Sequence, residues 1–229
     1  MTLPLLLTHG FGASAAMWEP NLAALSADRE VITWDLPGHG ASELDDFTHD
    51  ACVAHMVTLL GGAPRAVIGG MSLGGFLSLA FHLRHPERVA ALLLVDTGPG
   101  FRSDRARTEW NEQAQQAATD LDTQGLDALP DRPETRDARH VSGAQGIARA
   151  ARGILTQQDA AVIESLPSIA VPTLIVVGAD DTPFLAAADA MADRIPGATK
   201  VVIEDAGHAA NMDQPEQFNR AVLDFLENV

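Results

Sequence analysis

The stretch AVIGGMSLGGFL, residues 66–77, decides the fold, because an apolar run, a glycine-rich turn and a helical pattern meet in it. Within it, Gly70-Met71-Ser72-Leu73-Gly74 fits the pattern G-x-S-x-G, which places a serine on a sharp turn between a strand and a helix. The flanking glycines let the backbone turn without Cβ clashes and hold the serine in strained geometry. The pattern predicts that Ser72 is a nucleophile. A glycine-rich turn of a nucleotide-binding fold is the alternative, but the phosphate-loop lysine and the pattern G-x-G-x-x-G are absent here.

Short apolar runs alternate with amphipathic segments on both sides of this stretch. Most runs are apolar on both faces, which is typical of parallel strands covered by helices on each side. The predicted strands are Leu3–Thr8, Glu30–Trp34, Ala66–Gly69, Val89–Val95, Thr173–Val177 and Thr199–Ile203. The predicted helices are Trp18–Ser26, Phe47–Leu60, Gly74–His85, Thr182–Arg194 and Pro215–Glu227. This order predicts an α/β protein with a doubly wound, mostly parallel sheet, whose ligand lies at the carboxyl ends of the strands.

One segment, residues 98–168, breaks this alternation. It contains no convincing strand, and its helix-like patterns are interrupted by Leu129-Pro130 and Arg132-Pro133. We expect a helical insertion after the strand Val89–Val95, which divides the chain into a core of residues 1–97 and 169–229 and an inserted segment of residues 98–168.

A serine hydroxyl needs a general base, and the base needs an acid to orient it. Of the eight histidines, His208 alone lies in a loop shortly after a late strand. The dipeptide Asp180-Asp181 follows the strand Thr173–Val177, so the chain order is serine, aspartate, histidine. Spacing does not separate Asp180 from Asp181, and Asp96, after the preceding strand, is a third candidate.

The reaction also needs donors for a developing oxyanion. One is expected to be the backbone N–H of Leu73, the residue after the nucleophile. The other is expected from the loop His9-Gly10-Phe11-Gly12 after the first strand, and we assign it to the N–H of Phe11, because the glycines on either side allow close approach to a substrate.

Composition limits the classes of partner. The 229 residues are 46% hydrophobic and carry a formal net charge of −16, so nucleic acid and anionic membranes are unfavourable partners. Cys52 is the single cysteine, which excludes an intrachain disulfide and fits a cytoplasmic location. The apolar start of the chain lacks a basic region and a cleavage site, and we interpret it as a buried strand.

Four separated motifs together resemble those of the α/β-hydrolase superfamily over nearly the whole chain. They are His9-Gly10-Phe11-Gly12 with Trp18, Asp35-Leu36-Pro37-Gly38-His39-Gly40-Ala41-Ser42, Gly70-Met71-Ser72-Leu73-Gly74-Gly75, and Gly207-His208 followed by Pro215-Glu216. The sequence looks most like the branch of esterases, enol-lactonases and carbon–carbon hydrolases. It does not look like the haloalkane dehalogenases or epoxide hydrolases, which have an aspartate where Ser72 stands.

The resemblance implies several site assignments. In such enzymes the acid usually stands three residues after the glycine that ends its strand, which selects Asp181 from Gly178. The resemblance also implies that His9 and His39 are structural loop residues and that residues 98–168 form a lid. Family members usually begin with two additional strands, so we expect a sheet of about six strands with Glu30–Trp34 at an exposed edge. An unpaired edge motivates the hypothesis of a homodimer, with a monomer as the alternative.

Three further patterns have competing interpretations. His49, Asp50, Cys52 and His55 could be metal ligands, but a helix surface with one buried cysteine is the favoured interpretation. Trp18 and Trp110 could line the pocket, although packing within the lid explains Trp110 equally well. Eight arginines in the insertion could bind a substrate carboxylate, or they could pair with nearby acids on a solvated helix face; they are Arg102, Arg105, Arg107, Arg132, Arg136, Arg139, Arg149 and Arg152.

These observations predict a serine hydrolase that cleaves a carboxylic ester or lactone of a small molecule through an acyl-enzyme on Ser72, with His208 and Asp181. Neither a metal nor an organic cofactor is required. Carbon–carbon hydrolysis or a lyase reaction on the same triad is one alternative, and a ligand-binding receptor built on a hydrolase scaffold is another.

Overall fold

A six-stranded parallel sheet forms the centre of the protein in the computed structural model, which describes residues 2–229. The strand order is β2-β1-β3-β4-β5-β6, with every neighbouring pair parallel. The strands are β1 (Leu5–Thr8), β2 (Val31–Trp34), β3 (Ala66–Met71), β4 (Val89–Val95), β5 (Thr173–Gly178) and β6 (Thr199–Ile203). The predicted fold class and all six strands are confirmed; β4 and β6 have the predicted bounds, and the other four differ by one or two residues at one end.

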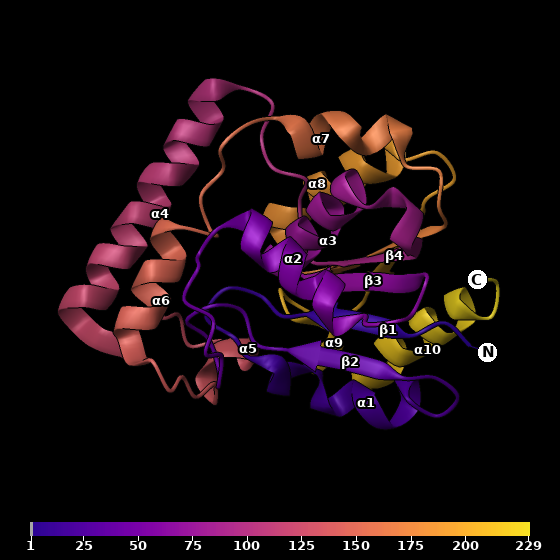
Figure 1. Cartoon of the computed structure of the whole chain (residues 1–229), viewed down its shortest axis with the longest axis horizontal. Helices are drawn as coiled ribbons and strands as arrows, with labels where there is room; N and C mark the ends of the chain where they lie inside the picture. Colours follow the sequence, from indigo (N-terminus) through magenta and orange to yellow (C-terminus); the bar gives the residue numbers. More distant parts are fainter. Residues whose placement is uncertain (1) are drawn as a thin grey trace.

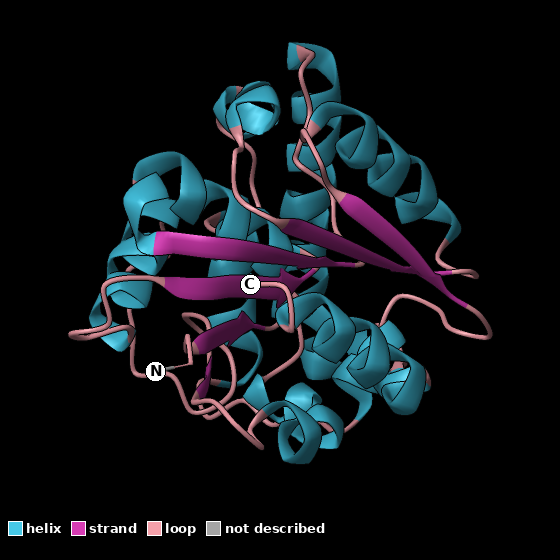
Figure 2. Ribbon diagram, turned by 90° about the vertical axis from the view of Figure 1, so that its right-hand side faces the viewer, coloured by secondary structure: helices cyan, strands magenta, loops and turns pink. Residues whose placement is uncertain are grey.

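Helices cover both faces of this sheet (Figure 2). The α-helices are α1 (Glu19–Leu25), α2 (His49–Leu59), α3 (Leu73–Arg84), α4 (Asp104–Gln124), α5 (Pro133–Arg136), α6 (Gly143–Arg152), α7 (Ala161–Ser165), α8 (Thr182–Arg194), α9 (Ala210–Asp213) and α10 (Pro215–Leu226). Short 3₁₀ helices span Ala15–Trp18, Pro86–Arg88, Gly125–Ala128 and Leu166–Ser168. No helix among residues 2–229 combines the length and apolar character that crossing a bilayer requires.

Two apolar clusters pack against the opposite faces of the sheet. Ile68 and Phe81 belong to the cluster beneath α2 and α3, whereas Val67 and Phe218 belong to the cluster beneath α1 and α10. Adjacent strand residues point to opposite faces, so a strand covered on both sides must be apolar throughout. All six residues of β3 and all seven of β4 are buried, which explains their unbroken apolar sequence.

Residues 98–168 contain helices and no strand, and α4 packs along α6 outside the sheet, at the left of Figure 1. These two helices share a small apolar cluster that includes Leu121 and Ile147. The segment is also tied to the rest of the chain, because Ile154 and Leu166 belong to the cluster beneath α3.

The edge strand β2 pairs with β1 alone among residues 2–229, as expected for Glu30–Trp34. Three of its four residues are partly exposed. The homodimer hypothesis that this edge motivates stays a prediction.

Candidate active site

Ser72 lies on the turn between β3 and α3, in a backbone conformation with φ 53° and ψ −115° that few residues other than glycine adopt. Two hydrogen bonds hold this strained residue: its N–H donates to the Val95 carbonyl at 2.9 Å, and its carbonyl accepts from the Thr97 hydroxyl at 2.6 Å. A Cβ at position 74 would lie 2.2 Å from the Thr8 carbonyl oxygen. Glycine is therefore required by close packing, as the G-x-S-x-G pattern predicts.

His208 pairs with Asp181 rather than with either of the other candidate acids. The His208 Nδ1–H donates to Asp181 Oδ2 at 2.8 Å, and the Asp181 side chain is only 4% exposed. This bond fixes the proton on Nδ1 and leaves Nε2 free to accept another. The Phe184 ring stacks on the imidazole with 4.7 Å between centroids, which further fixes its orientation. Asp180, one residue away, is exposed.

Asp96 occupies a different role at the end of β4. It is fully buried, and its two carboxyl oxygens accept from the N–H groups of Gly178 at 2.8 Å and Ala210 at 3.0 Å. Gly178 ends the strand before Asp181, and Ala210 follows His208 by two residues. Asp96 thus connects the segments that carry the acid and the base. Burial raises the pKa of its carboxyl well above the usual range, against the lowering effect of these two hydrogen bonds.

The backbone N–H groups of Phe11 and Leu73 donate no hydrogen bond to any acceptor among residues 2–229. Leu73 is the first residue of α3, where N–H groups lack partners within the helix. A Cβ at Gly10 would lie 3.3 Å from Ser72 Cβ, so the loop with Phe11 passes directly beside the serine. Both predicted oxyanion donors are therefore close to Ser72 in the chain or in space.

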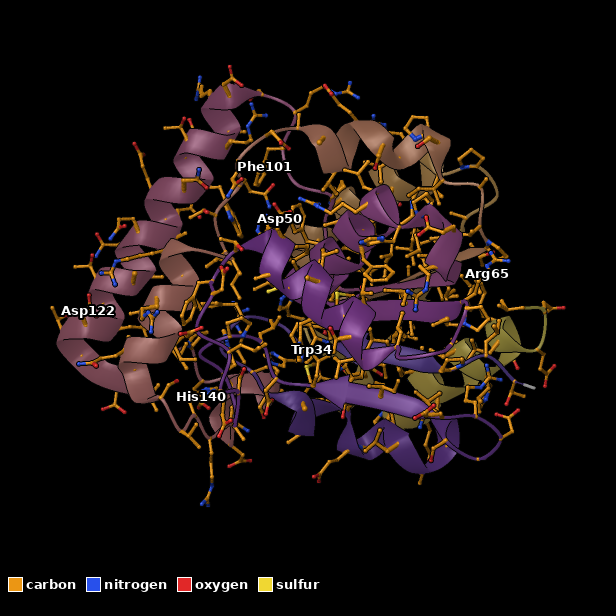
Figure 3. The ribbon with its side chains drawn as sticks, in the orientation of Figure 1. Trp34, Asp50, Arg65, Phe101, Asp122 and His140 are labelled. Atoms are coloured by element: carbon orange, nitrogen blue, oxygen red, sulfur yellow. The ribbon has the colours of Figure 1, made fainter. Side chains whose placement is uncertain are left out.

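Three histidines form hydrogen bonds with the loop that contains Phe11. His39 Nε2 accepts from the Gly12 N–H at 3.0 Å, and His140 Nε2–H donates to the Gly12 carbonyl at 3.2 Å. His9 donates from Nδ1 to the Gly10 carbonyl at 2.7 Å and accepts at Nε2 from the Leu36 N–H at 3.0 Å. His140, labelled in Figure 3, reaches this loop from the segment between α5 and α6.

Burial lowers the pKa of each of these three histidines, which favours the neutral ring. Burial lowers the pKa of His9 from 6.5 to about 4, despite the hydrogen bond to Gly10 and the nearby Asp35. Burial, reinforced by His9, lowers the pKa of His39 well below 6.5, and burial lowers that of His140. Because both ring nitrogens of His9 are used in one neutral tautomer, protonation would break its bond from Leu36.

Two cavities meet at Ser72. The larger, about 650 Å³, is lined by Ser72, Asp181, His208 and Phe11. The smaller, about 320 Å³, is mostly apolar and is lined by Ser72, Leu73, Phe76, Phe101, Leu155 and Ala187. Trp110 and Phe184 line both. Phe101, labelled in Figure 3, comes from the chain that enters α4. Another hollow, about 630 Å³ between β6 and α10, contains none of the predicted site residues.

Trp18 does not line either cavity at Ser72. It is fully buried and packs against Phe218, with 6.2 Å between ring centroids, so the suggestion that it lines the pocket was wrong. Trp110 does line the pocket, and its indole N–H donates to the Leu155 carbonyl at 2.7 Å.

Four of the eight arginines of the inserted segment form ion pairs with acids of the same segment. The pairs are Arg105–Glu109, Arg107–Asp104, Arg136–Asp131 and Arg152–Asp122. Arg149 lies over the Phe47 ring, 4.3 Å from its centroid. Among these arginines Arg132 alone lines either cavity at Ser72. This arrangement favours the interpretation that the arginines pair with acids on a solvated helix face, rather than forming a cluster that binds a substrate carboxylate.

The residues considered as metal ligands in α2 do not converge. His49 Nε2–H donates to the Ile154 carbonyl at 2.8 Å, and Asp50 pairs with Arg84 at 2.5 Å. Among residues 2–229, no group of three or more histidine, cysteine or acidic side chains is arranged to hold a metal.

Comparisons with known proteins agree with this fold. A model of the alpha/beta hydrolase family matches residues 5–221. RutD of Pseudomonas savastanoi pv. phaseolicola, named as a carbamate hydrolase, is 30% identical over 97% of this chain and 93% of its own. The pimeloyl-[acyl-carrier protein] methyl ester esterase of Aliivibrio salmonicida is also 30% identical, over 97% of this chain and 92% of the length of that esterase. The structure of MenH from S. aureus is similar with a TM-score of 0.89 and 25% identity, covering 100% of this chain and 95% of that one.

Proposed function

The chain belongs to the alpha/beta hydrolase family, and on that premise we propose that it is a serine hydrolase that cleaves a carboxylic ester or lactone of a small molecule through an acyl-enzyme on Ser72. The observation that carries the proposal is the 2.8 Å bond between His208 and Asp181, in the same cavity as a strained Ser72. Strain at a non-glycine residue persists where the surrounding structure enforces it, and such residues cluster at functional sites.

In the proposed reaction, Ser72 attacks the substrate carbonyl while His208 Nε2 takes the hydroxyl proton. Asp181 holds the imidazole in the reactive tautomer and stabilises the imidazolium that forms. The N–H groups of Phe11 and Leu73 stabilise the oxyanion, since neither donates to an acceptor among residues 2–229. His208 then returns the proton to the leaving oxygen and activates a water that hydrolyses the acyl-enzyme.

The two cavities suggest where each half of the substrate binds. The leaving oxygen must lie within reach of His208, which lines the larger cavity and not the smaller one. We therefore assign the leaving group to the larger cavity and the acyl group to the apolar one. Residues 98–168 act as the lid in this proposal, because Phe101, Trp110 and Leu155 cover the acyl pocket.

The test is hydrolysis of p-nitrophenyl butyrate, a panel of lactones and a carbamate, with fluorophosphonate labelling of the nucleophile. Ser72→Ala should abolish labelling and lower kcat by about a thousandfold or more. Asp181→Asn should lower kcat by a similar factor, because the imidazole would lose its orienting acceptor. Asp180→Asn is the matched control and should retain most of the activity. Labelling or turnover that survives Ser72→Ala would reject the proposal.

A further inference from the structure

The larger cavity at Ser72 is lined by more anionic than cationic side chains. Besides Asp181, which pairs with His208, its lining includes Glu134, Asp180 and Asp213, against the single guanidinium of Arg132. Asp213 already forms a structural hydrogen bond, because its Oδ2 accepts from the Gly207 N–H at 2.8 Å. A leaving group with a carboxylate would meet repulsion here, whereas a cation would be attracted.

Glu134 distinguishes this cavity from a general acidic surface. The Glu134 residue is only 6% exposed, and its Oε2 is shielded from solvent and has no hydrogen-bond partner among residues 2–229. Neither Arg132 nor any other cation of residues 2–229 forms an ion pair with it. Buried carboxylates are normally paired, because desolvation without a compensating donor is unfavourable. The other carboxyl oxygen, Oε1, has no hydrogen bond to residues 2–229 either and is not shielded in this way, so it is the oxygen that a donor in the cavity can reach.

The position of Glu134 is fixed by the elements around it. It lies in α5, where Thr135 Oγ1 donates to the Pro130 carbonyl and accepts from the Arg132 N–H. A Cβ at Gly12 would lie 3.3 Å from Thr135, so α5 packs against the loop of Phe11. The helix α5 also contacts α9, which follows His208. Glu134 is therefore held between the oxyanion loop and the segment of the general base.

We propose that Glu134 recognises the leaving group of the substrate, and that this group carries a protonated amine. The inference rests on the proposed function, because the assignment of the leaving group to this cavity depends on His208 as its proton donor. An N–H on an ammonium fits best, since it supplies both a donor to Glu134 Oε1 and a charge opposite to those of Glu134 and Asp180.

The experiment compares butyrate esters whose alcohols have the same shape. The 2-(dimethylamino)ethyl ester carries an ammonium N–H at neutral pH, and the 3-methylbutyl ester is its neutral carbon isostere. The choline ester has the charge without the N–H and controls for electron withdrawal by the cation. We expect kcat/KM for the dimethylaminoethyl ester to be at least tenfold higher than that for the 3-methylbutyl ester. It should also be higher than that for the choline ester, but by a smaller factor.

Glu134→Gln, an isosteric change, should reduce this preference about tenfold, measured as the ratio of kcat/KM for the two esters within one variant, so that a uniform effect on the chemistry at Ser72 cancels. Glu112→Gln removes a charge from exposed α4 of the same segment, outside both cavities, and should leave the preference unchanged. Comparison across variants cancels the intrinsic reactivity of each ester.

Several results would overturn the proposal. These are the absence of a preference in the unaltered enzyme, a preference that survives Glu134→Gln, or one that Asp180→Asn abolishes instead. Inhibition of the unaltered enzyme by 2-(dimethylamino)ethanol, measured against 3-methylbutanol, tests the same idea without any variant, and equal inhibition would contradict it. Ser72-dependent hydrolysis of p-nitrophenyl butyrate without a preference rejects the role of Glu134 alone, whereas hydrolysis that is independent of Ser72 rejects the proposed function.

Discussion

Acid should destabilise this protein through His9, and the size of the effect follows from the structure. Burial holds the pKa of His9 at about 4, below the 6.5 of the unfolded chain. Between these two values the unfolded state binds more protons than the folded state, so stability falls as the pH is lowered. The contribution is present above pH 6.5 and is lost progressively as the pH falls toward 4.

For a group with these two pKa values, linkage gives a loss of about 2 kcal/mol between pH 7 and pH 5. The loss approaches about 3 kcal/mol below pH 4, at 1.36 kcal/mol for each unit of displacement. His39 and His140 change stability in the same direction, because burial lowers their pKa values too. A protein of ordinary stability would lose a sizeable fraction of its free energy of unfolding.

Urea unfolding of the unaltered chain and of His9→Gln at pH 7 and pH 5 isolates this contribution. Glutamine can accept from the Leu36 N–H and donate to the Gly10 carbonyl, but it does not titrate. The variant should therefore lose about 2 kcal/mol less than the unaltered chain over this interval. Ile68→Val, a buried change without a titrating group, should lower stability by about 1 kcal/mol at both pH values. If the unaltered chain and His9→Gln lose stability in parallel, the reasoning is refuted.

Three further outcomes are expected. Asp96→Asn replaces one of two accepting oxygens with a donor that faces a backbone N–H. It should reduce the free energy of unfolding by about 1–3 kcal/mol and lower kcat. An unchanged urea midpoint together with an unchanged kcat would contradict this. Gly38→Ala places a Cβ 2.3 Å from the Gly146 carbonyl at a φ of +78°, and should lower stability by about 1–3 kcal/mol, detectable as a lower Tm. Burial raises the pKa of Cys52 to about 12, so this thiol should react with a thiol reagent at pH 8 only after unfolding, and rapid labelling of the native protein would show otherwise.

Local patterns sufficed for the strands, for the five helices α1, α2, α3, α8 and α10 that cover the sheet, and for the turn at Ser72, but they gave no bounds for α4, the longest helix. They succeed because burial on both faces, helical periodicity and glycine at a tight turn each depend on residues close together in the chain. The same patterns left Asp96, Asp180 and Asp181 open as partners of His208. The bond between His208 and Asp181 joins residues 27 positions apart, so it depends on how two loops fold beside each other.

The candidate residues that sequence reasoning missed are those whose roles come from contacts between distant segments. Glu134 carries no local signal, because its burial arises only when α5 packs against the Gly12 loop and α9. His140 stands 128 positions from Gly12, which it contacts. Thr97 could have been noticed, since it directly follows a strand end where ligands gather.

The sequence by itself determined the parallel α/β fold, the helical nature of residues 98–168 and the strand-to-helix turn that presents Ser72, because backbone conformation and the alternation of burial are encoded locally. The acid partner of His208 was selected as Asp181 only through the family resemblance, and the tertiary structure shows the bond itself. Only the tertiary structure decided that Trp18 packs in the core and that Glu134 lines the site without an ion-pair partner among residues 2–229. These outcomes depend on distances between loops that a parallel sheet brings to one edge, and no spacing along the chain specifies those distances.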